Sequence, residues 1–138
     1  MRHKNWNQKG VAAVEFALVL PVLVLLLLGI IEFSVALYDK AVVTNASREG
    51  ARAGIVFRDT RVSDGEISGI VTNYCQNRMI TFGSTTQVAT TVLREGTASG
   101  DDLTVRVQYQ YQFLAVPKFV VGLAGGIQLG AQTVMRVE

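Results

Sequence analysis

The sequence predicts an α+β protein. A long N-terminal helix crosses a membrane and continues into a small domain, where a second helix packs on an antiparallel sheet of about three strands. Three observations predict this fold class. Residues 11–31 form an apolar run in which Glu15 is the only charge. Ser63 stands three residues before Glu66 and opens an amphipathic segment. Residues 103–113 alternate between apolar and polar side chains, as in a half-buried strand.

The apolar run is long enough to span a bilayer, because a helix rises about 1.5 Å per residue and the hydrocarbon core is about 30 Å thick. Three of the thirteen Lys and Arg residues precede the run, whereas Glu32 and Asp39 are the first charges after it. The positive-inside rule therefore places the N-terminus in the cytoplasm. We divide the chain into a cytoplasmic leader (1–10), a transmembrane helix (11–31), an extracytoplasmic helix extension (32–54) and an extracytoplasmic α+β domain (55–138).

Two residues of the run do not suit a simple anchor. Pro21 lacks an amide hydrogen, so we expect it to kink or loosen the helix. Glu15 either lies at the headgroup level or has a partner, because a mid-bilayer carboxylate costs about 2.5–3.5 kcal/mol. Cleavage after Gly10 would create an amino group on Val11, one helical turn from Glu15. The carboxylate of one subunit could then pair with the Val11 amine of the next.

The N-terminal motifs carry a family resemblance. Lys9-Gly10, four small or apolar residues and Glu15-Phe16 resemble the prepilin-peptidase signature of type IV pilin-like proteins. Three segments, at 10–21 (GVAAVEFALVLP), 45–53 (NASREGARA) and 135–138 (MRVE), resemble the TadE-like family of pilus-assembly proteins. The resemblance covers the N-terminal third closely and the rest loosely.

The resemblance implies a pilin-like subunit, a minor pilin or pseudopilin of the tight-adherence (Flp-type) pilus, which is a type IV pilus system. It implies cleavage between Gly10 and Val11 by a prepilin peptidase, with Glu15 and Phe16 carrying the assembly charge. The implied partners are the membrane, the peptidase, other pilin-like subunits and the pilus assembly platform. The implied location is the bacterial inner membrane, as a single-pass protein with a periplasmic domain, before incorporation in a surface pilus.

The helix is expected to continue beyond the membrane. No proline occurs from residue 32 to residue 53, and a glycine at position 54 suggests an end there. Arg48, Glu49 and Arg52 form either a solvated face with i,i+3 pairing or a docking surface for a neighbouring pilin. Apolar or small residues recur near helical spacing at Phe33, Leu37, Ala41, Thr44 and Ala51.

The second helix begins at a capping box formed by Ser63 and Glu66. Cys75, the only cysteine, is expected to be a core residue of this helix. The apolar face expected to pack on the sheet consists of Ile67, Ile70, Val71, Tyr74, Cys75 and Met79.

Strands are predicted at 86–94, 103–113 and 127–137, with a turn at 95–102. The apolar segment 114–126 either folds over the sheet edge as a loop or short helix, or exposes a surface. Such a surface would lie at a subunit interface or against the outer leaflet. Its candidate interface residues are Phe119, Val120 and Val121.

Composition argues against catalysis. His3 is the only histidine, so the usual Ser-His-Asp, Cys-His and His-rich metal sites cannot form. We expect no enzyme activity, cofactor, metal, nucleic acid or small-molecule substrate, and we read Asp101-Asp102 as a turn. Two alternatives remain. One is a binding or enzymatic domain on a membrane anchor, and the other is a secreted domain with a conventional signal peptide ending at residues 34–36.

Overall fold

A computed structural model describes residues 6–56, 61–82, 87–96, 98–113 and 127–137, with side chains described from residue 10 onward. It confirms the α+β class and the three-stranded antiparallel sheet. The chain forms, in order, α1 (Trp6–Ile55), α2 (Asp64–Gln76), β1 (Val88–Arg94), β2 (Asp102–Tyr111) and β3 (Ile127–Arg136).

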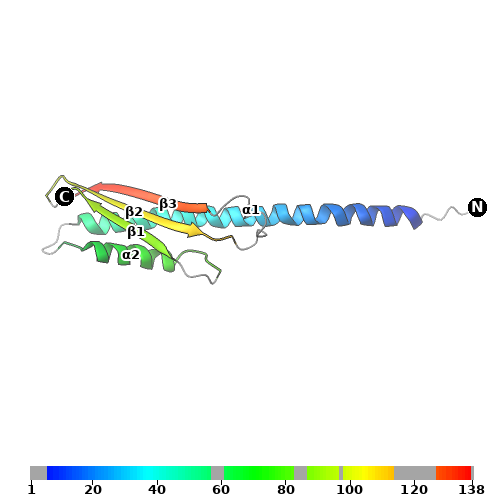
Figure 1. Ribbon diagram of the computed structural model, residues 1–138, viewed down its shortest axis with the longest axis horizontal. Helices are drawn as coiled ribbons and strands as arrows, with labels where there is room; N and C mark the ends of the chain where they lie inside the picture. Colours follow the sequence, from blue (N-terminus) through cyan, green and yellow to red (C-terminus); the bar gives the residue numbers. More distant parts are fainter. Residues whose placement is uncertain (1–5, 57–60, 83–86, 97, 114–126, 138) are drawn as a thin grey trace, which may run out of the picture.

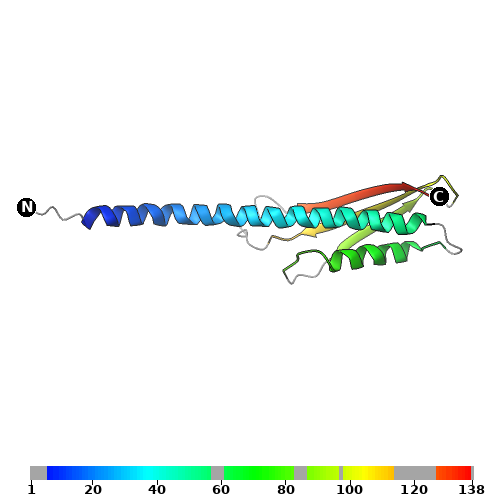
Figure 2. The same ribbon diagram turned by 180° about the vertical axis from the view of Figure 1, so that it is seen from behind.

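The molecule is a long rod with a small domain built around one end of it. The first part of α1 projects alone, and the sheet and α2 gather along its second part (Figure 1). The reverse view shows α2 running beside α1 (Figure 2). The sheet order is β1-β2-β3, so β2 lies at the centre. Its Val107 pairs with Thr90 of β1 and with Ala131 of β3.

The central strand confirms the predicted alternation. Its polar residues face away from the helices and remain exposed or half-buried. Both helices therefore lie on one face of the sheet, as predicted. The buried side chains of β2 are Leu103, Val105, Val107, Tyr109 and Tyr111.

The face of α1 that packs into the domain is rich in small residues. Phe33 and Leu37 are 61% and 55% exposed, whereas small residues such as Ala36 and Ala46 are buried. The physical reason is close packing. A Cβ on Gly50 would lie 2.6 Å from Cγ2 of Val71, which leaves no room for a larger side chain.

The end of α1 confirms the prediction, but its glycines have an additional role. The helix ends at Ile55, one residue beyond the predicted end. A Cβ on Gly54 would collide with Leu103 of β2 and would lie 2.7 Å from Cδ1 of Ile67 on α2. The glycines therefore let α2 and the sheet approach α1 closely, beyond any effect on helix termination.

α1 continues without interruption through Pro21. The loosening expected there does not end the helix. Proline removes one hydrogen bond of the helical ladder, and the residues on either side keep theirs.

The capping box of α2 is confirmed. The amide of Glu66 donates to Ser63 Oγ over 3.2 Å, and the amide of Ser63 donates to Glu66 Oε2 over 2.7 Å. Cys75 is fully buried, as predicted. The apolar face of α2 packs on α1 as well as beside β1, whereas the sequence suggested packing on the sheet.

The turn between β1 and β2 has ordinary turn chemistry. The amide of Ala98 donates to Asp101 Oδ2 over 2.7 Å, and Gly100 has a φ of 100°, which favours glycine. Below this turn, Arg94 of β1 donates to Asp64 of α2 over 2.7 Å, which ties the sheet to the start of α2.

Candidate functional site

The first half of α1 presents an apolar surface in every direction. Side chains from residue 11 to residue 27 are exposed, including Phe16 (63%) and Leu18 (72%). Within the described residues, α1 is the one helix that length and composition suit for crossing a membrane, and none of its most apolar window is buried. An apolar helix with no protein partner on any face is compatible with a lipid environment.

The predicted processing and assembly residues lie together on this exposed helix. Gly10, Val11, Glu15 and Phe16 all belong to α1, and Val11 is 58% exposed. Val11 and Glu15 are one helical turn apart, so they share a face. Glu15 forms no hydrogen bond or ion pair within the described part of the chain. A Cβ on Gly10 would meet no atom within 4 Å.

The three charged residues on the second half of α1 are exposed. Arg48, Glu49 and Arg52 lie on the exposed side of α1. Among the residues that the structure describes, no ion pair joins Glu49 to either arginine.

The remaining predicted interface residues cannot be placed. Phe119, Val120 and Val121 lie outside the described residues.

Sequence reasoning missed two buried carboxylates on α1. Glu32 is 4% exposed and accepts a 2.9 Å hydrogen bond from the hydroxyl of Tyr111. Asp39 is fully buried, and its Oδ1 accepts a 3.0 Å hydrogen bond from the amide of Ile80, just after α2. Acidic residues directly after a transmembrane run read as headgroup-level charges, so the sequence carried no signal that both turn inward.

Burial around Asp39 shifts several proton affinities. Desolvation raises the pKa of Asp39 above 3.8, although the Ile80 amide opposes the shift. Desolvation raises the pKa of the Cys75 thiol to about 11, and the nearby Asp39 carboxylate adds to the effect. The same two causes raise the pKa of Tyr109. Within the described residues, Asp39 Oδ2 has no hydrogen-bond partner, so the Ile80 amide is the donor that offsets the cost of burying this carboxylate.

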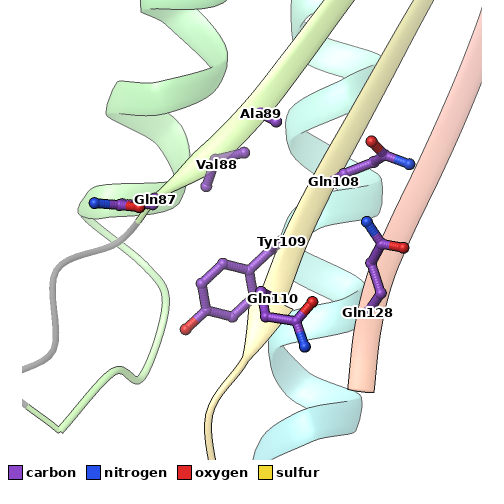
Figure 3. Close-up of a pocket in the computed structure, with 7 residues that line it drawn as sticks. All are labelled: Gln87, Val88, Ala89, Gln108, Tyr109, Gln110 and Gln128. Atoms are coloured by element: carbon purple, nitrogen blue, oxygen red, sulfur yellow. The ribbon is translucent and has the colours of Figure 1, made fainter. Parts of the chain in front are cut away.

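The open face of the sheet offers little for chemistry. A shallow hollow of about 290 Å³ lies where β1, β2 and β3 run side by side, and glutamine side chains from β2 and β3 border it (Figure 3). Within the described residues, no group of three His, Cys, Asp or Glu side chains could hold a metal ion. The hollow is lined by Gln87, Val88, Ala89, Gln108, Tyr109, Gln110 and Gln128.

The segment that carries the predicted processing site and the exposed apolar helix is similar to a known protein family. Residues 10–52 match the model of the TadE-like protein family. The match confirms the resemblance seen in the sequence, and it ends within the second half of α1. It covers less than half of the chain and includes neither α2 nor the sheet.

The TadE-like match indicates a protein related to the tight-adherence pilus, with an N-terminal hydrophobic helix compatible with membrane anchoring. No curated protein and no solved structure matches the chain. The TadE-like segment includes all four predicted processing and assembly residues and also Arg48, Glu49 and Arg52.

Proposed function

We propose that this TadE-like protein is a pilin-like structural or assembly subunit, a minor pilin or pseudopilin of the tight-adherence pilus. The observation that carries the proposal is the position of Glu15. Its carboxylate sits on an apolar, exposed helix without a partner in the described part of the chain, one turn after Val11. A carboxylate in that position is stabilised when a second subunit supplies a cation.

Processing would create that cation. A prepilin peptidase cleaves after Gly10, where the helix surface is open, and leaves an amino group on Val11. The Glu15 carboxylate of one subunit then pairs with the Val11 amine of its neighbour, and each charge is neutralised in the membrane. Loss of one partner from such a buried pair costs about 3–5 kcal/mol. The pair therefore favours ordered, head-to-tail assembly.

The exposed side of α1 supplies the rest of the contact. Arg48, Glu49 and Arg52 lie on the exposed side of the second half of α1. A neighbouring subunit that packs along this part of the helix would pair with these charges. The protein would act by assembly, on the pilus platform and with other pilin-like subunits, and would have no catalytic activity.

The proposed location is the bacterial inner membrane, with a cytoplasmic N-terminus and a periplasmic domain. The secreted alternative is disfavoured because residues 34–36 lie inside α1 and Ala36 belongs to the buried core. Signal-peptide cleavage there would remove Glu32, to which Tyr111 is hydrogen-bonded.

N-terminal sequencing of the membrane-fraction protein tests the proposal, in cells with and without the prepilin peptidase. We expect a mature chain that starts at Val11 only when the peptidase is present. A chain that starts at Met1 in both strains would contradict processing, and a start at Leu37 would contradict the role of Glu15.

A further inference from the structure

The folded domain lies directly against the end of the apolar run, with no stalk between them. The hydroxyl of Tyr111 donates to Glu32, the first residue after the run, and the ring of Phe113 meets the Tyr111 ring edge-on at 5.5 Å. The hydrogen bond from the Ile80 amide to Asp39 places the segment after α2 roughly 12 Å beyond the run, at about 1.5 Å per residue. A headgroup layer is about 5–8 Å deep on each side of a bilayer, so Glu32 and the end of β2 lie within it, and Asp39 and Ile80 lie a few ångströms beyond it.

Apolar side chains gather at this end of the domain and remain exposed. They come from α1, from the segment after α2 and from the start of β3, which pairs with the end of β2. We call this surface the base: Phe33 (61% exposed), Leu37 (55%), Ile80 (40%), Phe82 (55%) and Ile127 (38%).

The charges near the base are sorted by sign. Its two carboxylates, Glu32 and Asp39, are turned into the protein and buried. The described charged side chains that remain exposed there, Lys40 and Arg78, are both cations. Among the described residues, the exposed acids of the domain lie farther from the base, at Glu49 on α1, at Asp64 and Glu66 at the start of α2, and at Glu95 after β1.

Apolar and aromatic side chains with only cations among them suit the interface of a phospholipid bilayer. Aromatic residues favour the headgroup level, and basic residues near a membrane surface are attracted to anionic lipids. Because Glu32 and Asp39 are both buried, the described part of the base presents no exposed negative charge to an anionic lipid surface.

We propose that the base rests on the outer surface of the same membrane that α1 spans. The protein would then contact lipid twice, through α1 and through a surface far from it in sequence. This inference depends on the membrane anchoring proposed above. It commits to lipid as the occupant of the base because the base continues the apolar surface of α1.

Brominated lipids test the proposal, because bromine quenches tryptophan fluorescence on contact. The full chain is placed in lipid nanodiscs with bromine near the headgroup end of the acyl chains. Trp6, the only tryptophan, is first replaced by Phe. Phe82→Trp then reports on the base. Leu93→Trp is a matched control, because Leu93 is 54% exposed, as Phe82 is, but lies near the end of β1 that is far from the base. Leu25→Trp reports on the transmembrane run, with bromine placed deeper.

We expect the Phe82→Trp protein to lose fluorescence in brominated discs and the Leu93→Trp protein to keep it. Quenching at position 25 without quenching at position 82 would overturn the inference and leave the anchoring intact. The same result is expected if a second subunit, and not lipid, covers the base. Equal quenching at positions 82 and 93 would also overturn it, since contact would not be confined to the base. Absence of quenching at position 25 would overturn the anchoring and this inference together.

Discussion

The hydroxyl of Tyr111, at the end of β2, donates a 2.9 Å hydrogen bond to the buried carboxylate of Glu32 on α1. This bond joins the sheet to the helix at the point where the apolar run ends. Tyr111→Phe would remove the donor and leave the carboxylate with one partner fewer in a buried site. We expect a loss of about 1–3 kcal/mol in the free energy of unfolding of the domain. Denaturant unfolding of the detergent-solubilised chain measures it.

Tyr109→Phe is the matched control. Tyr109 is buried on the same strand, but its hydroxyl makes no hydrogen bond within the described residues. An equal loss in both variants would show that the hydroxyl of Tyr111 does not act through Glu32.

Replacing glycine by alanine should lower the stability of the protein at two positions of α1 and raise it at one position of α2. Gly50→Ala and Gly54→Ala place a methyl group against Val71 and against Ile67 and Leu103, all of which are buried. Overpacking of this kind costs about 1–3 kcal/mol, more than the gain in helix propensity. Gly69→Ala on α2 meets no atom within 4 Å, so it should stabilise the protein by up to about 1 kcal/mol. Thermal unfolding of the three variants would contradict the packing role if all three gained stability.

Asp39 should make the stability of the domain depend on pH. Burial raises its pKa above 3.8, so the folded protein holds this proton more tightly than the unfolded chain does. The resulting stability is fully present below about pH 4 and is lost as the pH rises through the raised pKa. Asp39→Asn removes this titration, so the free energy of unfolding of the variant should gain on that of the wild type as the pH rises.

Unfolding midpoints measured across this pH range test the Asp39 prediction. The diagnostic quantity is the pH dependence of the difference, because the new amide group changes the absolute stability as well. Glu49→Gln is the control, since Glu49 is exposed and should leave the slope unchanged. A constant difference between Asp39→Asn and the wild type would rule out the titration.

Cys75 should not react in the folded protein. It is fully buried, and its pKa is raised to about 11, so at pH 8 it is an inaccessible thiol rather than a thiolate. We expect N-ethylmaleimide to label it only after denaturation, as seen by mass spectrometry. A cysteine at the exposed Ser99, in a Cys75→Ala chain, should label at once. Rapid labelling of Cys75 in the native chain would mean that α2 opens readily.

The processing and assembly residues separate two steps. Gly10→Leu should block cleavage, because it places a bulky side chain next to the bond that the peptidase would cut. Glu15→Ala should leave cleavage intact and reduce incorporation into pili, since the Val11 amine loses its partner. Val14→Ala, at an exposed neighbouring position, should affect neither step. Immunoblots of sheared pili and membranes measure both, and normal piliation of Glu15→Ala would show that its charge does not drive assembly.

Local patterns in the sequence were enough to predict most of the fold. The alternation along β2 reports its own burial, because each side chain on a strand faces the opposite way from its neighbours. The capping box at Ser63 and Glu66 is equally local, as both bonds close within one turn.

The buried face of α1 was less predictable from sequence. Phe33 and Leu37 are large apolar residues at helical spacing, yet they are exposed, and Ala36 and Ala46 are buried in the core instead. Small residues give a weak hydrophobic signal in a sequence. Their effect, which is to let a second element pack closely, depends on contacts that the sequence of the helix does not show. The inward orientation of Glu32 and Asp39 was hidden for a similar reason, because it depends on Tyr111 and Ile80, far along the chain.

α1 runs unbroken from Trp6 to Ile55, so a single continuous helix carries the carboxylate of Glu15 near one end and packs against the sheet near the other. Each residue turns a helix by about 100°. One residue added in the leucine block would therefore rotate the whole domain by about 100° relative to Glu15 and leave both parts otherwise intact. The number of helix residues between Glu15 and the domain thus sets the direction in which a subunit presents its domain once Glu15 is paired with a neighbouring subunit.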